Sequence, residues 1–447
     1  MAALPLIQGF PAGAIFGYRR GRRVAVEVFL RDVMRLAEKL PRRRHVLNLC
    51  ADRYWFAVGL AGAMVREQVT LLPPNDTPDL LGRLASQYPD VYCFGDRPLP
   101  LAGIKTVGFP DESADAGPAP PVPSLSEQQP AVIMFTSGST GAPVPSRKTW
   151  GSLIRTARAE CESLDLHAWP GLALLGTVPP QHAFGLESTV MIGMHCGFPL
   201  HSGRPFFPAD IRAELASLPR PRGLVTTPVH LRVLLAEPDE LPPADFLLCA
   251  TAPLSPQLAA AAEARFRAPL HEIYGCTESG GIASRRTVAA AEWRALRDVS
   301  LRSDGRGTWV NGGPVETEVL LADVIELRGR GEFLLHGRSG DLVNIAGKRT
   351  SLAHLNYHLN SIEGVRDGVF MAPEEEGEAE GVTRLTAYVV APGLTSESLL
   401  SALRQRIDAA FLPRPLHLVD ALPRNATGKL PRQALDELNA GLARKTG

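Results

Sequence analysis

Short apolar runs alternate along this chain with longer stretches in which apolar residues recur at helical spacing. Residues 24–40 form such a stretch, with Phe29, Val33 and Ala37 on one face and Pro41 at its end, and they predict a helix. Residues 53–66 predict a second helix. Short apolar runs predict buried strands at residues 45–49, 69–72, 172–177, 223–227, 246–249 and 270–273. This alternation predicts an α/β fold in which helices cover a mostly parallel sheet.

The pattern changes at residues 337–341, where the sequence is the short polar segment Gly-Arg-Ser-Gly-Asp. Beyond it the sequence predicts strands at 342–345, near 369 and at 385–390, and helices at 352–362 and 396–411. The acidic run 374–378 predicts a solvated hairpin tip, and the Pro- and Gly-rich residues 98–130 predict a long irregular connection. We therefore expect a large N-terminal domain over residues 1–337, a hinge at 338–341 and a small α+β domain over 342–447.

Composition narrows the functional classes. The 447 residues contain 47 Lys+Arg and 47 Asp+Glu, and this balance argues against a general nucleic-acid-binding protein. No apolar stretch is long enough to cross a bilayer, so membrane insertion is not expected. The apolar residues 1–16 precede the basic run 19–23, which is the reverse of a signal peptide, and they indicate a cytoplasmic protein. The six cysteines are scattered without a C-x-x-C pair, so most are expected in the core.

The first fifty residues carry ten Lys+Arg against three Asp+Glu. Such a stretch suits an acidic partner or a phosphorylated ligand, but a solvated helix face explains it more simply.

A glycine- and hydroxyl-rich loop follows the apolar run 131–135; its residues are Thr136, Ser137, Gly138, Ser139, Thr140 and Gly141. Glycines let backbone N–H groups approach an anion, and hydroxyls add further donors. The loop is therefore a candidate triphosphate cradle, although such turns are common in proteins without one. It is not a Walker A loop, because Ala142-Pro143 follows where Lys-Ser or Lys-Thr is required. It is not a hydrolase nucleophile elbow either, because Ser139 lacks the flanking Gly-x-Ser-x-Gly pattern.

Five further stretches follow this loop in order: residues 177–185 (Thr-Val-Pro-Pro-Gln-His-Ala-Phe-Gly), 250–254 (Ala-Thr-Ala-Pro-Leu), 274–278 (Tyr-Gly-Cys-Thr-Glu), Asp323 upstream of Gly337-Arg338, and 423–429 (Pro-Arg-Asn-Ala-Thr-Gly-Lys). With these motifs, the chain resembles the adenylate-forming superfamily of acyl- and aryl-CoA ligases, nonribosomal adenylation domains and luciferases. The match runs from about Met134 to Arg432. Residues 301–337 resemble the compact branch that activates 3-hydroxybenzoate on an acyl carrier protein for aryl-polyene (xanthomonadin-type) pigment synthesis.

The resemblance implies a fold with a large N-terminal domain of mixed, largely parallel sheets and a small mobile C-terminal domain. It implies that ATP and Mg²⁺ are needed to join a carboxylate to the α-phosphate with release of pyrophosphate. The implied nucleotide-binding residues are Thr136, Ser137, Gly138, Ser139, Thr140, Gly141, Thr251, Ala252, Pro253, Tyr274, Gly275, Thr277, Asp323 and Arg338. In that scheme Tyr274 stacks on adenine, Asp323 accepts from the ribose hydroxyls, and Thr277 donates to the α-phosphate. Glu278 is the implied magnesium ligand.

The resemblance also implies the catalytic and acyl-binding groups. Lys429, on the small domain, would bridge the attacking carboxylate and the α-phosphate, although a lone lysine in such a turn is usually just exposed. His182 would gate the second half-reaction, with a buried core histidine as the alternative. The implied acyl pocket comprises His182, Phe184, Gly185, Cys276, Gly280 and Gly281. The glycines leave room for a flat ring, which favours an aryl or short acyl group.

The chain departs from the family pattern at three places. Val144 stands where most members have a lysine, so that Lys148 is the nearest candidate for the γ-phosphate. Gly340 replaces the usual hinge Asp or Lys, and His354 and Asn356 occupy a usually acidic helix. The sequence thus favours a ligase that adenylates an aromatic acid, a hydroxybenzoate, and passes it to an acyl carrier protein or CoA. The alternatives are a small-acid acyl-CoA ligase and a binding protein that has lost the chemistry.

Overall fold

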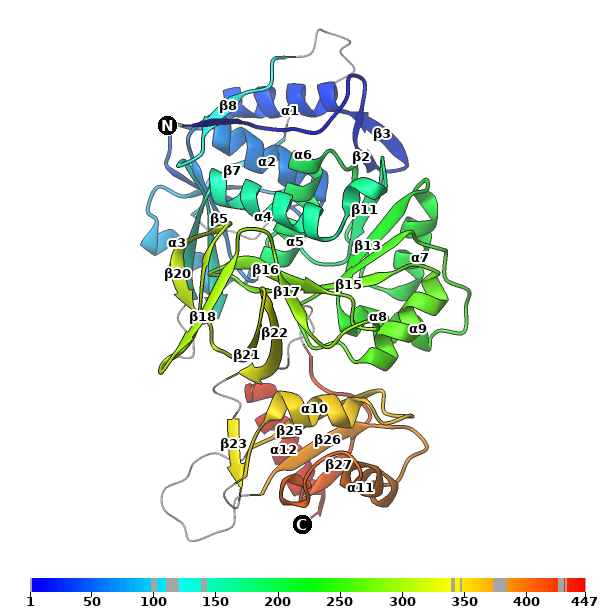
Figure 1. Cartoon of the computed structure of the whole chain (residues 1–447). Coiled ribbons are helices and arrows are strands. Elements are labelled where there is room, and N and C mark those ends of the chain that lie inside the picture. The colour runs from blue at the N-terminus through cyan, green and yellow to red at the C-terminus, as the bar shows by residue number, and fades with distance from the viewer. Residues whose placement is uncertain are drawn as a thin grey trace.

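The structure is a computed structural model that describes residues 2–97, 103–109, 120–137, 143–338, 342–345, 348–372, 384–424, 430 and 432–446 (Figure 1). Several features of the sequence analysis therefore lie outside the described residues: Gly138, Ser139, Thr140 and Gly141 of the loop, residues 339–341 of the hinge predicted at 338–341, the acidic tip at 374–378, and Lys429.

The largest sheet has eleven strands in the order β21-β22-β17-β16-β15-β14-β13-β11-β12-β2-β3. Its central strands run parallel to one another: β2 (Ile15–Arg19), β12 (Leu200–His201), β11 (Ala173–Gly176), β13 (Arg222–Thr226), β14 (Phe246–Cys249) and β15 (Leu270–Cys276). Antiparallel strands extend the sheet at its two ends: β3 (Arg22–Ala25), β16 (Gly280–Arg285), β17 (Trp293–Ala295), β21 (Asp323–Gly329) and β22 (Glu332–Arg338).

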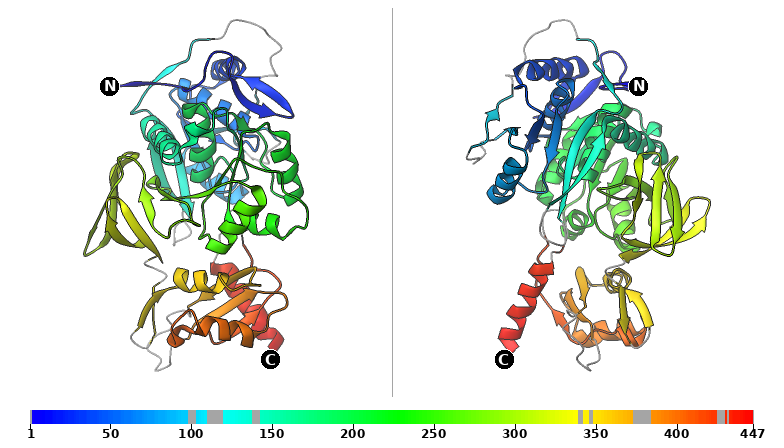
Figure 2. Two further views of the ribbon diagram at one scale, coloured as in Figure 1. Left: turned by 45° about the vertical axis from the view of Figure 1, so that its right-hand side comes forward. Right: turned by 90° about the vertical axis from the view of Figure 1, so that its left-hand side faces the viewer.

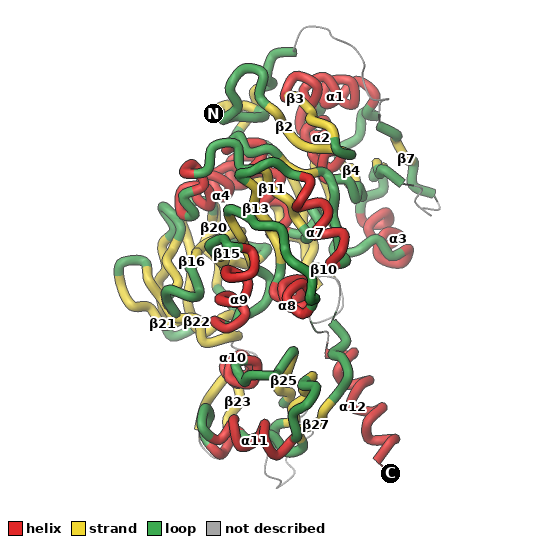
Figure 3. The backbone as a smooth tube through the Cα atoms, turned by 90° about the vertical axis from the view of Figure 1, so that its right-hand side faces the viewer, coloured by secondary structure: helices red, strands yellow, loops and turns green. Residues whose placement is uncertain are grey.

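Alternate side chains of the parallel strands enter two different cores. Leu175, Leu224 and Leu247 pack against the helices α7 (Pro208–Ser217), α8 (Pro228–Ala236) and α9 (Pro256–Phe266). These helices lie together on one side of the sheet, as the tube view shows (Figure 3). Leu174, Val225 and Leu248 face the opposite core. Burial on both faces explains why these strands read as continuous apolar runs.

A second sheet of six strands has the order β10-β9-β5-β4-β6-β7. Its strands are β4 (His45–Asn48), β5 (Val69–Leu72), β6 (Tyr92–Phe94), β7 (Thr106–Val107), β9 (Pro130–Ser137) and β10 (Pro143–Thr149). All are parallel except β10, which pairs antiparallel with β9. The helices α1 (Val26–Lys39), α2 (Arg53–Val65) and α4 (Trp150–Ser163) contribute side chains to the core between the sheets. Helix α3 (Pro78–Gln87) packs with a smaller core beside this sheet.

The remaining elements of the large unit are short. Strands β1 (Ala3–Pro5) and β8 (Ser124–Ser126) pair with each other, so the predicted irregular connection contains strand structure. Strands β18 (Ser300–Asp304), β19 (Gly307–Gly312) and β20 (Val315–Leu320) form a separate antiparallel sheet. The segment from Ala183 to Cys196 is helical throughout, with α5 (Ala183–Gly185), a π-helical stretch (Leu186–Met191) and α6 (Ile192–Cys196).

The residues after the predicted hinge have a core of their own, built from side chains such as Leu355, Phe370 and Leu399. Their elements are β23 (Leu342–Ile345), β24 (Lys348–Ser351), α10 (Leu352–Asn360), β25 (Asp367–Met371), β26 (Thr386–Val390), α11 (Ser396–Arg404), β27 (Leu416–Leu418) and α12 (Arg432–Thr446). Figure 2 shows these elements as a smaller unit beside the large one. An ion pair of 3.8 Å between Arg232 of α8 and Asp367 of β25 links the two units.

The α/β fold class is confirmed, and the predicted strands and first helices lie where the sequence placed them. The single helix predicted over 396–411 is wrong. Helix α11 ends at Arg404, and a separate 3₁₀ turn covers Ala409–Phe411. The Asp408 carboxylate starts that turn by accepting a hydrogen bond from the Ala410 N–H, which satisfies a backbone donor outside any continuous helix.

Candidate functional site

The predicted motifs gather at one edge of the large sheet, where its parallel strands end. Strand β11 leads into residues 177–185, β14 leads into 250–254, and β15 ends in 274–276. Because these strands are parallel neighbours, their carboxyl ends share that edge. In open α/β sheets this edge is where ligands bind. The fold therefore brings together motifs that lie about a hundred residues apart in the sequence.

Tyr274 and Asp323, both predicted to bind the nucleoside, are in contact. The Tyr274 hydroxyl donates to the Asp323 carboxylate at 2.8 Å, across a sequence separation of 49 residues. The Tyr274 ring also lies 5.6 Å from the Trp293 ring and 5.9 Å from that of Phe333, which fixes its orientation. In the register of the β21–β22 pair, Asp323 stands opposite Arg338, the other nucleotide-binding residue predicted on these strands.

Thr251, which follows β14, has an unusual backbone conformation. Its φ angle is +83°, in the left-handed region that β-branched residues rarely adopt. Strain of this kind costs about 1–3 kcal/mol and persists only where the surrounding structure imposes it, which is typical of binding sites. The strained residue lies within the segment predicted to face adenine, beside Ala252 and Pro253.

Residues 277–279 form the turn between β15 and β16, in which the Ser279 hydroxyl accepts from the Cys276 N–H at 3.3 Å. The Glu278 side chain is exposed at this turn. Two side chains of β10 hold the turn from the other sheet. The Ser146 hydroxyl donates to the Thr277 carbonyl at 3.3 Å, and the Lys148 ammonium donates to the Glu278 carbonyl at 2.6 Å.

Lys148 is therefore a buried support for this turn, with only 6% of its surface exposed. Burial lowers its pKa, while the carboxylate of Glu187 acts in the opposite direction. The ammonium group, the nearest candidate for the γ-phosphate, donates to the Glu278 carbonyl in this structure. Val144, at the position where the family resemblance implies a lysine, is 51% exposed.

His182 begins the helical segment after β11, and its Nδ1 accepts from the Phe184 N–H at 3.3 Å. Gly185 is required by packing, because a Cβ on it would collide with the Pro179 carbonyl oxygen. Phe184 is buried, whereas His182 is half-buried. The imidazole is thus a half-buried capping group at the sheet edge, bonded through Nδ1 to the chain itself.

Arg53, at the start of α2, is a site-positioning residue that the sequence analysis missed. It is completely buried, and its guanidinium donates to the carbonyls of Gly176 and Val178 at 3.0 and 2.9 Å and to those of His201 and Gly203 at 3.2 and 2.8 Å. Burial lowers the pKa of Arg53 to about 10. These bonds fix the chain where it leaves β11 toward His182. No sequence signal marks this arginine, because its partners are backbone atoms distant in the chain.

Two buried glutamates were also missed. Glu160 of α4 and Glu187 of the π-helical stretch lie beside Gly280 and Gly281, which were predicted to line the acyl pocket. A Cβ on Gly280 or Gly281 would meet the carboxyl oxygens of these glutamates. A Cβ on Gly275, on the neighbouring strand, would meet the Gly280 carbonyl. The only available signal was a glutamate within the otherwise apolar and hydroxyl-bearing run Leu-Glu-Ser-Thr-Val-Met.

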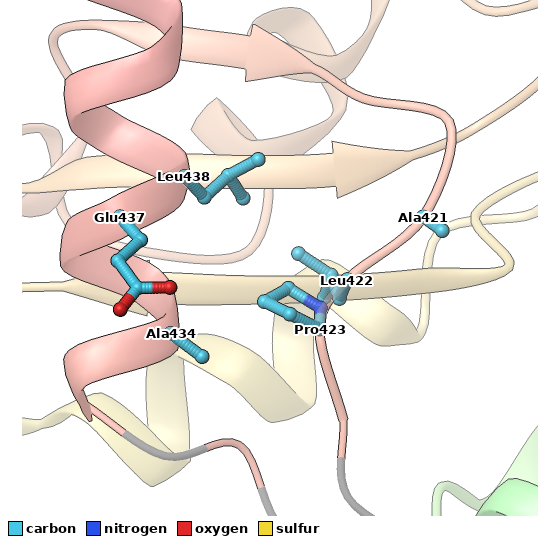
Figure 4. A pocket seen from close by; sticks show the side chains of 6 residues that line it. All are labelled: Ala421, Leu422, Pro423, Ala434, Glu437 and Leu438. Carbon is cyan, nitrogen blue, oxygen red and sulfur yellow. The ribbon is translucent and has the colours of Figure 1, made fainter.

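Other features of the described residues add little chemistry. A pocket between Pro423 and helix α12 is lined by Ala421, Leu422, Pro423, Ala434, Glu437 and Leu438 (Figure 4), but it contains no predicted site residue. Among the described residues, no group of three or more His, Cys, Asp or Glu side chains is arranged to hold a metal ion. Within the same residues, no helix is long and apolar enough to cross a membrane.

The fold and the sheet-edge residues define a nucleotide-dependent enzyme of the α/β class. The chain belongs to the AMP-binding enzyme family, whose model matches residues 41–338. Within that family it is an adenylate-forming, AMP-forming acid–thiol ligase.

Among curated relatives, the chain is 29% identical over 301 residues to a 4-coumarate–CoA ligase of Rhodobacter capsulatus, covering 66% of this chain and 74% of that one. It is 24% identical over 353 residues to a 3-hydroxybenzoate–CoA/4-hydroxybenzoate–CoA ligase of Thauera aromatica, covering 69% and 66% respectively. Among solved structures, ATP-bound MatB from Rhodopseudomonas palustris matches with a TM-score of 0.79 at 18% identity, covering 95% of this chain and 96% of that one. These structural likenesses establish the fold.

Proposed function

We propose that this enzyme uses ATP and Mg²⁺ to convert an aromatic carboxylic acid, a hydroxybenzoate, into its acyl-adenylate, and then transfers the acyl group to a thiol. The observation that carries the proposal is the Tyr274–Asp323 hydrogen bond of 2.8 Å at the edge where the parallel strands end. It supports the proposal because a nucleoside is bound by an aromatic face against its base and a carboxylate on its ribose, and here the two groups are adjacent. The 4-coumarate and hydroxybenzoate ligases among the relatives support an aromatic acid.

The nucleoside would lie against Tyr274, with the strained segment at Thr251 and Ala252 beside the adenine. Asp323 would accept from the ribose hydroxyls, since a carboxylate offers two acceptor oxygens. Its hydrogen bond from Tyr274 leaves the second oxygen for the ribose, and Arg338 stands opposite on β22. Residues 136–141 would bind the β- and γ-phosphates, and the Thr277 hydroxyl would donate to the α-phosphate.

Glu278 fits a magnesium ligand because its side chain is exposed at the turn after β15 while its carbonyl is held by Lys148. Magnesium commonly binds one or two carboxylates together with substrate phosphates, so a multi-residue protein cage is not needed. Bound there, the ion would neutralise phosphate charge. Lys429 would stabilise the charge that develops between the carboxylate and the α-phosphate. We propose residues 1–337 as the adenylation domain, 338–341 as its hinge and 342–447 as a mobile domain that carries Lys429.

The acyl group would lie beside His182, Phe184 and Gly185, near Cys276 and the glycines of β16. For the acceptor we propose either CoA, as in the CoA ligases among the relatives, or the phosphopantetheine of an acyl carrier protein. The second acceptor would place the enzyme in the aryl-polyene branch that residues 301–337 resemble.

Pyrophosphate exchange with a panel of aromatic and short aliphatic acids tests the first half-reaction. We expect Lys429→Ala to lower exchange by about 10²–10³-fold while ATP still binds, because a transition-state donor is lost. Lys348→Ala is the matched control, since Lys348 of the small unit pairs with Asp408 at 2.6 Å. Exchange with no acid at all would overturn the function, and unchanged turnover by Lys429→Ala would overturn the role of that lysine. Thioester trapping with CoA and with a holo carrier protein then identifies the acceptor.

A further inference from the structure

Two buried carboxyl groups beside the predicted acyl pocket are only half satisfied. Glu160 and Glu187 are 0% and 3% exposed. One oxygen of each is bonded: the Ser188 hydroxyl donates to Glu160 Oε2 at 2.8 Å, and the Gly281 N–H donates to Glu187 Oε2 at 3.1 Å. Within the described part of the chain, the Oε1 atoms of both have no hydrogen-bond partner. An unsatisfied buried acceptor costs about 1–3 kcal/mol, so two together call for a missing donor.

Both unpartnered oxygens point at the start of β16. A Cβ on Gly280 would lie 3.0 Å from Glu187 Oε1, and one on Gly281 would lie 2.5 Å from Glu160 Oε1. These glycines stand opposite Cys276 and Gly275 of β15, at the edge where the nucleotide residues gather. The two oxygens therefore approach neighbouring residues of β16 from α4 and from the π-helical stretch, beside the proposed acyl pocket. A π-helical stretch is itself a common feature of functional sites.

The charges around this spot also favour a ligand that donates. Lys148 is the cation that opposes the charge of Glu187, but its ammonium group is engaged with the Glu278 carbonyl. Burial raises the pKa of both glutamates, that of Glu187 to about 7, which shows how poorly the protein alone solvates their charge. Burying carboxyl oxygens without hydrogen-bond partners is unfavourable, so apolar side chains would be more stable at these two positions if no polar ligand group bound there.

We propose that Glu160 and Glu187 are specificity-determining residues that accept hydrogen bonds from a donor substituent, a hydroxyl or amino group, on the acid that the enzyme adenylates. This inference rests on the proposed function and narrows its substrate class. A site built around buried acceptors rejects an analogue that lacks the donor, because the acceptors are then left unpaired. The preferred acid thus carries a hydroxyl or amino donor in addition to its carboxylate.

The test compares pyrophosphate exchange by the full-length enzyme with benzoate, 3- and 4-hydroxybenzoate, 3- and 4-aminobenzoate, and 3- and 4-methoxybenzoate. A methoxy group accepts hydrogen bonds but cannot donate them. We expect kcat/KM for at least one hydroxy or amino acid to exceed that for benzoate and for its methoxy analogue by at least about tenfold, on the scale of one buried hydrogen bond. Equal values for donor and non-donor acids would overturn the inference.

Variants then assign the preference to the pair. Glu187→Gln and Glu160→Gln keep size and shape but put an amide donor beside the substituent, so the donor-to-methoxy ratio should fall toward one. Glu272→Gln is the matched control, because Glu272 is equally buried but is bonded by Arg285 at 2.7 Å and by Thr287. An unchanged ratio in both pair variants, or the same fall in the control, would refute the assignment.

The wild-type panel needs no variant, so misfolding of a variant leaves the inference falsifiable. Failure of the proposed function gives a different result, since no acid then supports exchange.

Discussion

Glu187 makes the stability of the free enzyme depend on pH in a direction opposite to that of most carboxylates. Burial, opposed by Lys148 and by the Gly281 N–H, raises its pKa from 4.5 to about 7. Between these two values the folded chain holds a proton that the unfolded chain has released. Folding is therefore favoured at low pH, and this contribution disappears as the pH rises through about 7.

The magnitude follows from the size of the pKa shift. Each pKa unit corresponds to about 1.4 kcal/mol, so a shift from 4.5 to about 7 gives a contribution of roughly 3 kcal/mol. Gln resembles the protonated acid at every pH. We therefore expect Glu187→Gln to match the wild type near pH 5 and to be more stable by roughly 2–3 kcal/mol at pH 8.

Urea unfolding of the ligand-free wild type and Glu187→Gln at half-unit intervals from pH 5 to pH 8 measures this difference. Taking the difference between the two proteins removes the contribution of the other titrating groups, apart from Glu160 and Lys148, which interact with Glu187 directly. A difference in unfolding free energy that is constant across this range would refute the raised pKa, and a difference that grows toward low pH would reverse its sign.

Three further substitutions test the geometry of the site. Gly185→Ala should destabilise by about 1–3 kcal/mol, because its Cβ would collide with the Pro179 carbonyl, whereas Gly82→Ala, which has open space in helix α3, should be neutral or slightly stabilising in the same thermal unfolding assay. Thr251→Gly relieves the positive φ and should therefore raise the unfolding free energy by about 1 kcal/mol. In a titration with ATP, we expect the same variant to bind the nucleotide more weakly than the wild type. Lys148→Met should cost about 1–3 kcal/mol in urea unfolding at pH 8, because it removes the donor to the Glu278 carbonyl and the charge that opposes Glu187, which then takes up a proton; an unchanged unfolding free energy would contradict that role.

The sequence predicted the parallel core well because its strands are buried on both faces. Leu174 and Leu175 enter opposite cores, so such strands appear as apolar runs whatever their neighbours are. The split of the predicted helix at 396–411 was not foreseeable from periodicity, because its cause is a local hydrogen bond from the Ala410 N–H to Asp408. Sequence signals fail here because a short-range polar contact overrides the apolar pattern.

The residues of the candidate site also fall into two groups, those that the sequence reveals and those that it does not. A motif such as 274–278 can be recognised in the sequence because its functional residues are consecutive. Arg53, Glu160 and Lys148 could not be found, because their roles depend on partners more than twenty-five residues away, and several of those partners are backbone carbonyls or N–H groups. The weak sequence signal for such residues is a charged residue within an otherwise apolar stretch.

The position of Lys148 changes how the proposed phosphate site must work. The family resemblance implies a lysine where this chain has Val144, and the register of β10 puts Val144 and Lys148 on the same face of the strand, four residues apart. Lys148, the lysine nearest to the position of Val144, is nonetheless buried, and its ammonium group donates to the Glu278 carbonyl. Under the proposed function, the β- and γ-phosphates are therefore neutralised by the donors of residues 136–141 and by the magnesium ion at Glu278. Lys148 acts on that ion indirectly, because it fixes the turn from which the Glu278 carboxylate extends.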